Sequence, residues 1–100
     1  MPSAVSVNGV PIRLTDERWG HIVDNKPNIY AFEDVIMEAI EAPTCVLAGY
    51  AGSLIAVRAL GRQRFLHVVY REVNADDGFV ITAYIAHKYN RRQAIWPQGS

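Results

Sequence analysis

Two long apolar segments separated by a short turn constrain the fold of this chain most strongly. The first covers Arg64–Val73 and the second Phe79–Ala86, with five residues between them. Both segments are rich in β-branched and aromatic residues, which favour strands. A connection this short joins antiparallel strands, because a parallel pair needs a crossover of about a dozen residues. The sequence therefore predicts a β-hairpin near the C-terminal end.

Two further strands are predicted directly before this hairpin. They cover Thr44–Ala48 and Ser53–Leu60, and glycine-containing connections of three or four residues separate them from each other and from the hairpin. Short connections between successive strands are typical of an antiparallel meander. Four strands in one antiparallel sheet are therefore expected.

Two helices are predicted ahead of the strands. Thr15 is a good N-cap, Trp19 and Ile22 lie on one apolar face, and Pro27 disfavours helical geometry at the residue before it. A second helix is expected over Tyr30–Glu41, with its apolar residues on one face.

The first residues predict a short hairpin or ribbon. Asn8 and Gly9 stand between two apolar runs, and both residue types tolerate the positive φ of a hairpin turn. Pro11 cannot donate a hydrogen bond to a neighbouring strand, so an edge position is expected.

These elements predict one α+β domain over residues 1–100. Its two N-terminal helices pack on one face of a four-stranded antiparallel sheet, with the short N-terminal hairpin or ribbon beside it. Half of the residues are hydrophobic and a fifth are charged, as in a folded globular chain. A length of 100 residues suits one modest core.

Composition narrows the function classes. No apolar run approaches the roughly 20 residues that span a bilayer, and no signal-peptide pattern opens the chain, so no membrane partner is expected. Cys45 is the lone cysteine, which excludes an internal disulfide and fits a cytoplasmic location. The sequence contains no Gly-rich phosphate loop, no HExxH motif and no Cys/His ligand spacing, so neither a cofactor nor a metal site is predicted.

Charge is divided unevenly along a chain whose net charge is zero. The first 50 residues hold three basic and seven acidic side chains, whereas the last 50 hold seven basic and three acidic ones. A local basic surface can attract a polyanion without a high overall pI. Solvation of opposite faces by Arg and Glu explains the same pattern equally well. Candidate RNA-binding residues are Lys26, Lys88, Arg91 and Arg92.

Alternation of side chains along the strands predicts a polar cluster on one face. In the last strand Phe79, Ile81, Ala83 and Ile85 form the apolar set that should meet the helices. Leu66, Val68 and Tyr70 form the matching set in the preceding strand, and Ile55, Val57 and Ala59 form it in the strand before. The other face then carries Arg58, His67, Arg71, Thr82 and Tyr84. One β-bulge would break this assignment.

The polar cluster contains the side-chain types that metal-independent RNA cleavage requires. A base takes the 2′-hydroxyl proton, an acid protonates the leaving oxygen, and cations stabilise the charged transition state. His titrates near neutrality, Arg matches phosphate oxygens, and Tyr and Thr supply hydroxyls. Structural explanations compete with this one: Thr82 and Tyr84 are good strand formers, His67 can bond a carbonyl, and Arg58 and Arg71 can form surface ion pairs.

Three segments resemble a family of small nucleases. They are IRLTDERWGHI (Ile12–Ile22), VYREV (Val69–Val73) and VITAY (Val80–Tyr84). They resemble the phage- and mobile-element-associated domains of the barnase–EndoU–colicin–RelE group. The resemblance implies N-terminal helices on a four-stranded antiparallel sheet and metal-independent cleavage of RNA, typically by a toxin.

The resemblance also implies roles for individual residues. His21 corresponds to the histidine of the first helix and would be general acid or base, with His67 as the substitute. Arg58 or Arg71 corresponds to the basic strand residue, and Thr82 and Tyr84 to the hydroxyl and phenol of the last strand. The chain departs from the pattern at Lys26-Pro27-Asn28, where such domains often have His-Pro-Glu.

Three functions follow as hypotheses. The first is a toxin-like endoribonuclease that cleaves RNA through attack of the 2′-hydroxyl. The second is a non-catalytic RNA- or protein-binding module of the same fold, which the Lys26-Pro27-Asn28 departure favours. The third is one member of a toxin–antitoxin pair, bound by a protein antitoxin or inhibitor. The sequence leaves homo-oligomer formation open.

Overall fold

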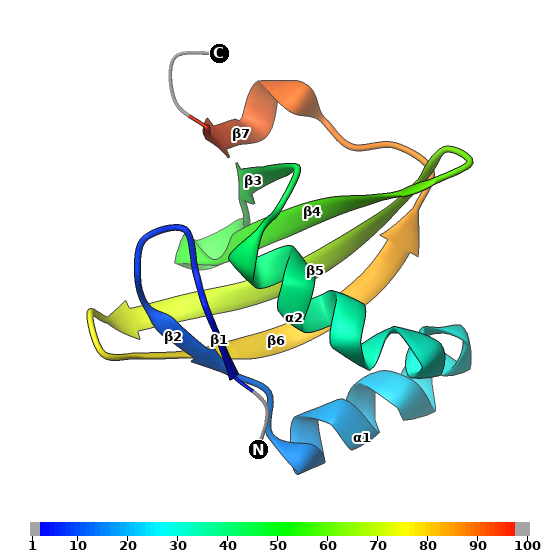
Figure 1. Ribbon diagram of the computed structural model, residues 1–100, viewed down its shortest axis with the longest axis horizontal. Helices are drawn as coiled ribbons and strands as arrows, with labels where there is room; N and C mark the ends of the chain where they lie inside the picture. Colours follow the sequence, from blue (N-terminus) through cyan, green and yellow to red (C-terminus); the bar gives the residue numbers. More distant parts are fainter. Residues whose placement is uncertain (1–2, 98–100) are drawn as a thin grey trace.

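The computed structural model describes residues 3–97, which form one layer of helices against one face of a single sheet (Figure 1). The helical elements, three of them short 3-10 helices, are α1 (Asp16–Asn25), η1 (Pro27–Phe32), α2 (Glu33–Glu41), η2 (Tyr50–Gly52) and η3 (Arg91–Gln93). The strands are β1 (Ser3–Val5), β2 (Pro11–Arg13), β3 (Cys45–Ala48), β4 (Leu54–Gly61), β5 (Arg64–Asn74), β6 (Asp77–Ala86) and β7 (Ala94–Trp96).

The sheet has seven strands in the order β1-β2-β6-β5-β4-β3-β7, so the predicted layout with a four-stranded sheet is wrong. Strands β3 to β6 form the expected antiparallel meander. The N-terminal ribbon joins it because β2 pairs parallel with the start of β6, and β7 pairs antiparallel with β3 at the other edge. Each added strand has only three residues, too few for an alternating pattern to be visible in the sequence.

The first helix follows its predicted signals. The Thr15 side chain accepts a hydrogen bond from the backbone N–H of Arg18 and caps α1, which ends one residue before Lys26. The second predicted helix, Tyr30–Glu41, is split: α2 begins only at Glu33, and the 3-10 helix η1 precedes it. Pro27 opens η1, consistent with the preference of proline for the first turn of a helix.

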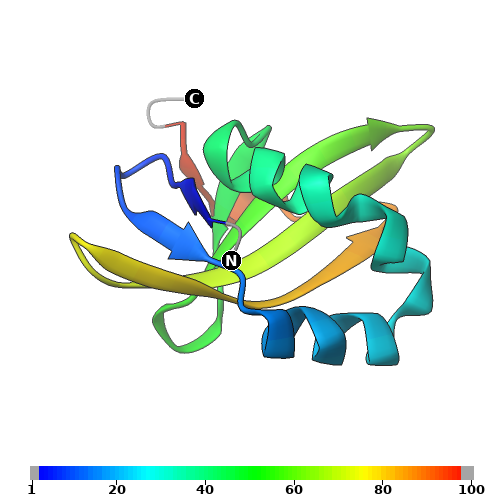
Figure 2. The same ribbon diagram turned by 60° about the horizontal axis from the view of Figure 1, so that its bottom comes forward.

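Helices α1 and α2 lie on the same side of the sheet, as Figure 2 shows. Their buried residues Ile22, Ile36 and Ile40 pack in one cluster with Leu66 and Val68 of β5. This helix-covered face holds the main hydrophobic core.

A β-bulge in β6 changes the predicted alternation. Tyr70 pairs with Val80 and Val69 pairs with Thr82, so Ile81 has no partner in β5. Val80 therefore joins Ala83 in the buried core, and the prediction that Phe79 and Ile81 face the helices together with Ala83 is wrong. The extra residue shifts the alternation by one position.

The prediction for β4 is also wrong. Ala56 pairs with Val68 and is fully buried in the helix-side core, whereas Val57 pairs with His67 and belongs to a second cluster on the other face. Because the second face has its own small core, apolar residues occupy both faces of β4. Arg58 consequently lies on the helix-covered face, opposite the predicted one, where it pairs with Leu66.

No helix in residues 3–97 is long and apolar enough to cross a membrane. The longest, α1, has ten residues, about half of the roughly 20 that a membrane-spanning helix needs.

Gly78 lies where three strands meet, and replacing it tests this junction. It pairs with Ile12 of β2 and Glu72 of β5, and an added Cβ would lie 2.5 Å from Ile12 Cδ1 and 2.6 Å from the Arg71 carbonyl oxygen. Backbone atoms in a sheet cannot move aside cheaply. We expect Gly78→Ala to lower the free energy of unfolding by about 2 kcal/mol in urea titrations.

Gly20 provides the matched control because an added Cβ at this α1 position meets nothing within 4 Å. Gly20→Ala should raise the free energy of unfolding by roughly 0.5–1 kcal/mol, the usual gain of Ala over Gly inside a helix. Equal effects of the two substitutions would contradict the close approach at Gly78.

Candidate functional site

Four of the predicted site residues share the helix-free face of the sheet. His67 of β5 pairs directly with Tyr84 of β6, and Thr82 pairs with Val69, two residues further along β5. Arg71 follows Val69 by two residues and therefore lies on the same face. The register thus brings together His67, Arg71, Thr82 and Tyr84.

His67 and Tyr84 stack on each other. Their ring centroids lie 4.8 Å apart with 17° between the planes, and His67 is only 4% exposed. His67 Nδ1 lies 3.1 Å from the carbonyl oxygen of Phe65, which can only accept, so the tautomer that fits carries its proton on Nδ1. Burial lowers the pKa of His67 and raises the pKa of Tyr84. The pair is therefore a neutral imidazole against a protonated phenol.

Thr82 is contacted by a cation from the helical layer. Lys26 Nζ donates to Thr82 Oγ1 at 3.4 Å, and the contact is partly buried. The backbone N–H of Lys26 bonds to the carbonyl of Ile22 and closes the last turn of α1, so the position of the ammonium group follows from the end of this helix. An ammonium group beside a hydroxyl is a suitable pair of donors for a phosphate oxygen.

One donor of the Arg71 guanidinium holds a loop in place. Its Nη2 donates to the carbonyl oxygen of Ala51 at 2.8 Å, in the loop between β3 and β4. Ala51 has a φ of 55°, a conformation that a side-chain donor helps to hold. A guanidinium has five N–H donors, so this contact leaves Arg71 further donors for a ligand.

Two predicted residues lie outside this group. Arg58 donates to the carbonyl of Ala42 and lies 4.0 Å from Glu38 Oε2 of α2, on the helix-covered face. The His21 side chain is 60% exposed on α1, with Nε2 3.8 Å from Glu17 Oε1. Arg58 thus ties α2 to the sheet, and His21 is an accessible imidazole.

Sequence reasoning did not predict that the Tyr89 ring contacts Phe65 and His67 on the helix-free face. Its ring meets Phe65 edge-on at 5.1 Å and His67 at 6.4 Å, and the Arg91 guanidinium lies 5.9 Å from its centroid. The chain after β6 therefore returns across the helix-free face. The position of Tyr89 three residues after β6 indicates that this aromatic side chain can pack on the sheet, but the sequence does not show which strand it contacts.

Acidic and basic residues concentrate on different segments of the chain. All seven acidic residues of the first half belong to α1 or α2. Basic residues gather on the turn between β4 and β5 and on the segment after β6, and the bond of His87 Nδ1 to the carbonyl oxygen of Gln63 at 3.3 Å connects these two segments. We call this group the basic edge; it consists of Arg62, Arg64, Lys88, Arg91 and Arg92.

Residues 3–97 contain no group of three or more His, Cys, Asp or Glu side chains that could hold a metal ion.

Comparisons of the chain with protein-family models, curated proteins and solved structures found no match.

The burial of His67 predicts a pH dependence of stability. Because its folded-state pKa lies below the ordinary value of 6.5, the unfolded chain binds a proton more readily. The His67 contribution to stability is therefore fully present above about pH 6.5 and declines as the pH falls toward the folded-state pKa. We expect His67→Phe to reduce the loss of unfolding free energy between about pH 7 and about pH 5.5, measured by urea titration.

His21→Gln is the control for this experiment, because His21 is exposed and its replacement should leave the pH dependence in place. A His67→Phe protein with the wild-type slope would show that His67 does not resist protonation in the folded state.

Proposed function

We propose that this domain is a metal-independent endoribonuclease that cleaves RNA on β6, where Lys26 contacts Thr82 and Tyr84 lies two residues further along the strand. The observation that carries the proposal is the contact between Lys26 and Thr82, which holds an ammonium group beside a hydroxyl on the strand that also presents Tyr84. The resemblance to the barnase–EndoU–colicin–RelE group supports the same reaction.

The proposed reaction needs no group from outside the protein and the RNA. The 2′-oxygen attacks the adjacent phosphorus while the bond from phosphorus to the 5′-oxygen breaks, leaving a 2′,3′-cyclic phosphate. A base removes the proton of the 2′-hydroxyl, and an acid gives a proton to the departing 5′-oxygen. Negative charge accumulates on the phosphate oxygens between these events and requires donors that are already in place.

Each role has a candidate in this chain. Lys26 and Thr82 donate to the phosphate, and Arg71 offers further donors along the same face. Tyr84 keeps its proton at neutral pH because burial raises its pKa, so it serves as the acid. His21 is the proposed base, because its imidazole is exposed on α1, the helix that has Lys26 as its C-cap.

The charge separation supports RNA as the substrate. The basic edge adjoins the helix-free face through Tyr89 and would attract a phosphate backbone to it. An RNA strand that enters along Lys88, Arg91 and Arg92 would therefore be guided toward Tyr84.

The lone Cys45 fits a reducing compartment, and we propose that the protein acts in the cytoplasm.

A cleavage assay in EDTA tests the proposal. We expect purified protein to cut single-stranded RNA, and Thr82→Val and Tyr84→Phe to lower the rate by about tenfold or more because each removes one hydroxyl. His21→Gln should lower the rate by roughly a hundredfold. Tyr50→Phe is the matched control, since Tyr50 is 92% exposed on the β3–β4 loop and should leave the rate unchanged.

The second candidate is a non-catalytic RNA-binding module. It is favoured by the burial of His67 and by the use of one Arg71 donor to hold Ala51. A protein antitoxin or inhibitor would cover the same face. RNA binding without turnover in the wild type would establish the module and refute the nuclease, and equal rates in Tyr84→Phe and Tyr50→Phe would remove Tyr84 from the mechanism.

A further inference from the structure

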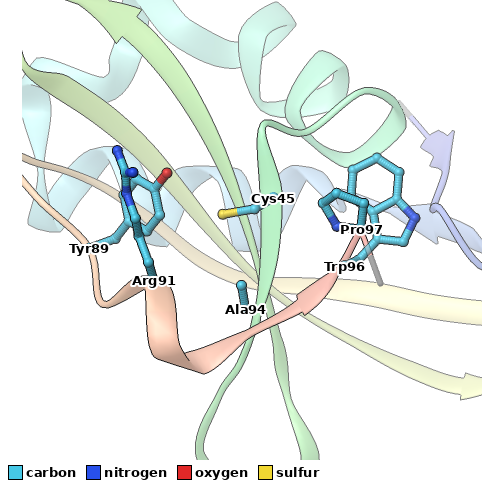
Figure 3. Close-up of a pocket in the computed structure, with 6 residues that line it drawn as sticks. All are labelled: Cys45, Tyr89, Arg91, Ala94, Trp96 and Pro97. Carbon is cyan, nitrogen blue, oxygen red and sulfur yellow. The ribbon is translucent and has the colours of Figure 1, made fainter. Parts of the chain in front are cut away.

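A cavity of about 540 Å³ lies between β3 and residues 89–97, outside the proposed cleavage site (Figure 3). It is lined by Cys45, Tyr89, Arg91, Ala94, Trp96 and Pro97. Figure 3 shows Tyr89 and Arg91 together on one side of Cys45, and Trp96 beside Pro97 on the other. Its volume falls within the range of about 300–1,000 Å³ typical of small-molecule sites.

The lining combines aromatic rings with one positive charge. Tyr89 and Trp96 offer ring surfaces, Arg91 offers a guanidinium, and none of the six lining residues is acidic. Burial raises the pKa of the Cys45 thiol, which therefore stays neutral and does not repel an anion. Aromatic surface next to arginine suits a planar group that carries a negative charge.

Arg91 is available to such a ligand. No ion pair between residues within the described range 3–97 involves Arg91, and its contact there is with the Tyr89 ring. Arginine recognises phosphate through parallel N–H donors, which the ring contact leaves unused.

A row of rings in contact links one wall of the cavity to Tyr84. Tyr84 stacks on His67, and His67 meets the edge of Tyr89, which lines the cavity. The row crosses the sheet from β6 toward β3, a distance of about 14 Å for three strand spacings. His67 is buried, so the partly exposed rings of Tyr84 and Tyr89 at the two ends of the row are the ones that can meet bases of a single strand.

We propose that this cavity is a nucleotide subsite, which holds one base against the aromatic lining and the phosphate of that nucleotide on Arg91. The inference rests on the proposed function, because it identifies the nucleotide as one of the RNA strand that runs toward Tyr84. The subsite is separate from the scissile phosphate and would determine which base is preferred at this position of the substrate.

Binding of adenosine 5′-monophosphate, a nucleotide without a scissile bond, tests the subsite. The protein carries Trp19→Phe, so that Trp96 is its single tryptophan and reports from the cavity. We expect calorimetry to give a dissociation constant of about 1 mM or lower and Trp96 fluorescence to change over the same concentrations. Adenosine and inorganic phosphate should each bind at least about tenfold more weakly, because each supplies half of the recognition.

Arg91→Gln and Arg92→Gln form a matched pair of variants, since both residues lie in η3 but only Arg91 lines the cavity. Arg91→Gln should weaken binding about tenfold or more, whereas Arg92→Gln should change it less than about twofold. Equal losses would indicate general attraction to the basic edge and would overturn the subsite. Binding without a Trp96 response would place the nucleotide elsewhere and would overturn it as well.

The cleavage assay separates this inference from the proposed function. A protein that cleaves RNA but binds no adenosine 5′-monophosphate refutes the subsite and leaves the nuclease in place. A protein that binds the nucleotide through Arg91 but cleaves nothing refutes the nuclease and supports the cavity as a nucleotide site.

Discussion

Strand β6 has to satisfy two different neighbours, and the bulge at Ile81 makes this possible. Before the bulge β6 pairs with β2 and places Val80 in the core, and after it Ala83 and Ile85 pack toward the helices. Regular alternation would put Val80 and Ala83 on opposite faces. With one residue left unpaired, both are covered by the helices while Thr82 and Tyr84 remain opposite β5 residues of the helix-free face. The core and the proposed site therefore depend on the same irregularity.

Sequence predicted those parts of the fold whose ends are marked by neighbouring residues, such as helix caps and turn residues. Thr15 caps α1 as expected, and the four meander strands lie close to their predicted positions because each is bounded by turn residues. The Asn8-Gly9 turn predicted the antiparallel pairing of β1 with β2, but the place of this ribbon and of β7 in the seven-stranded sheet was not predictable. That place is decided by partners far along the chain, such as Gly78 for Ile12, and a strand of three residues is too short for its alternation to identify such a partner.

Sequence predicted the face of a site residue only where polar and apolar side chains alternate clearly along its own strand. His67 and Arg71 were assigned correctly to the face opposite Leu66 and Val68, because those neighbours are plainly apolar. Arg58 was assigned to the wrong face because β4 is apolar on both sides and the sequence does not rank Ala56 above Val57. Tyr89 could not be placed at all, since its contact with His67 depends on where the chain turns after β6.

The parallel pairing of β2 with β6 has a consequence for how the chain folds. The two strands are about as far apart in sequence as Ser6 and Glu72, whose side chains share a hydrogen bond across a separation of 66 residues. The meander closes through short loops and can form early, whereas β2 must wait for a partner near the end of the chain. During synthesis β1 and β2 emerge before β6, and we expect them to be among the last parts of this sheet to dock. Until then the first residues of β6 present an open edge, which is the period in which this protein is most exposed to pairing with the wrong strand.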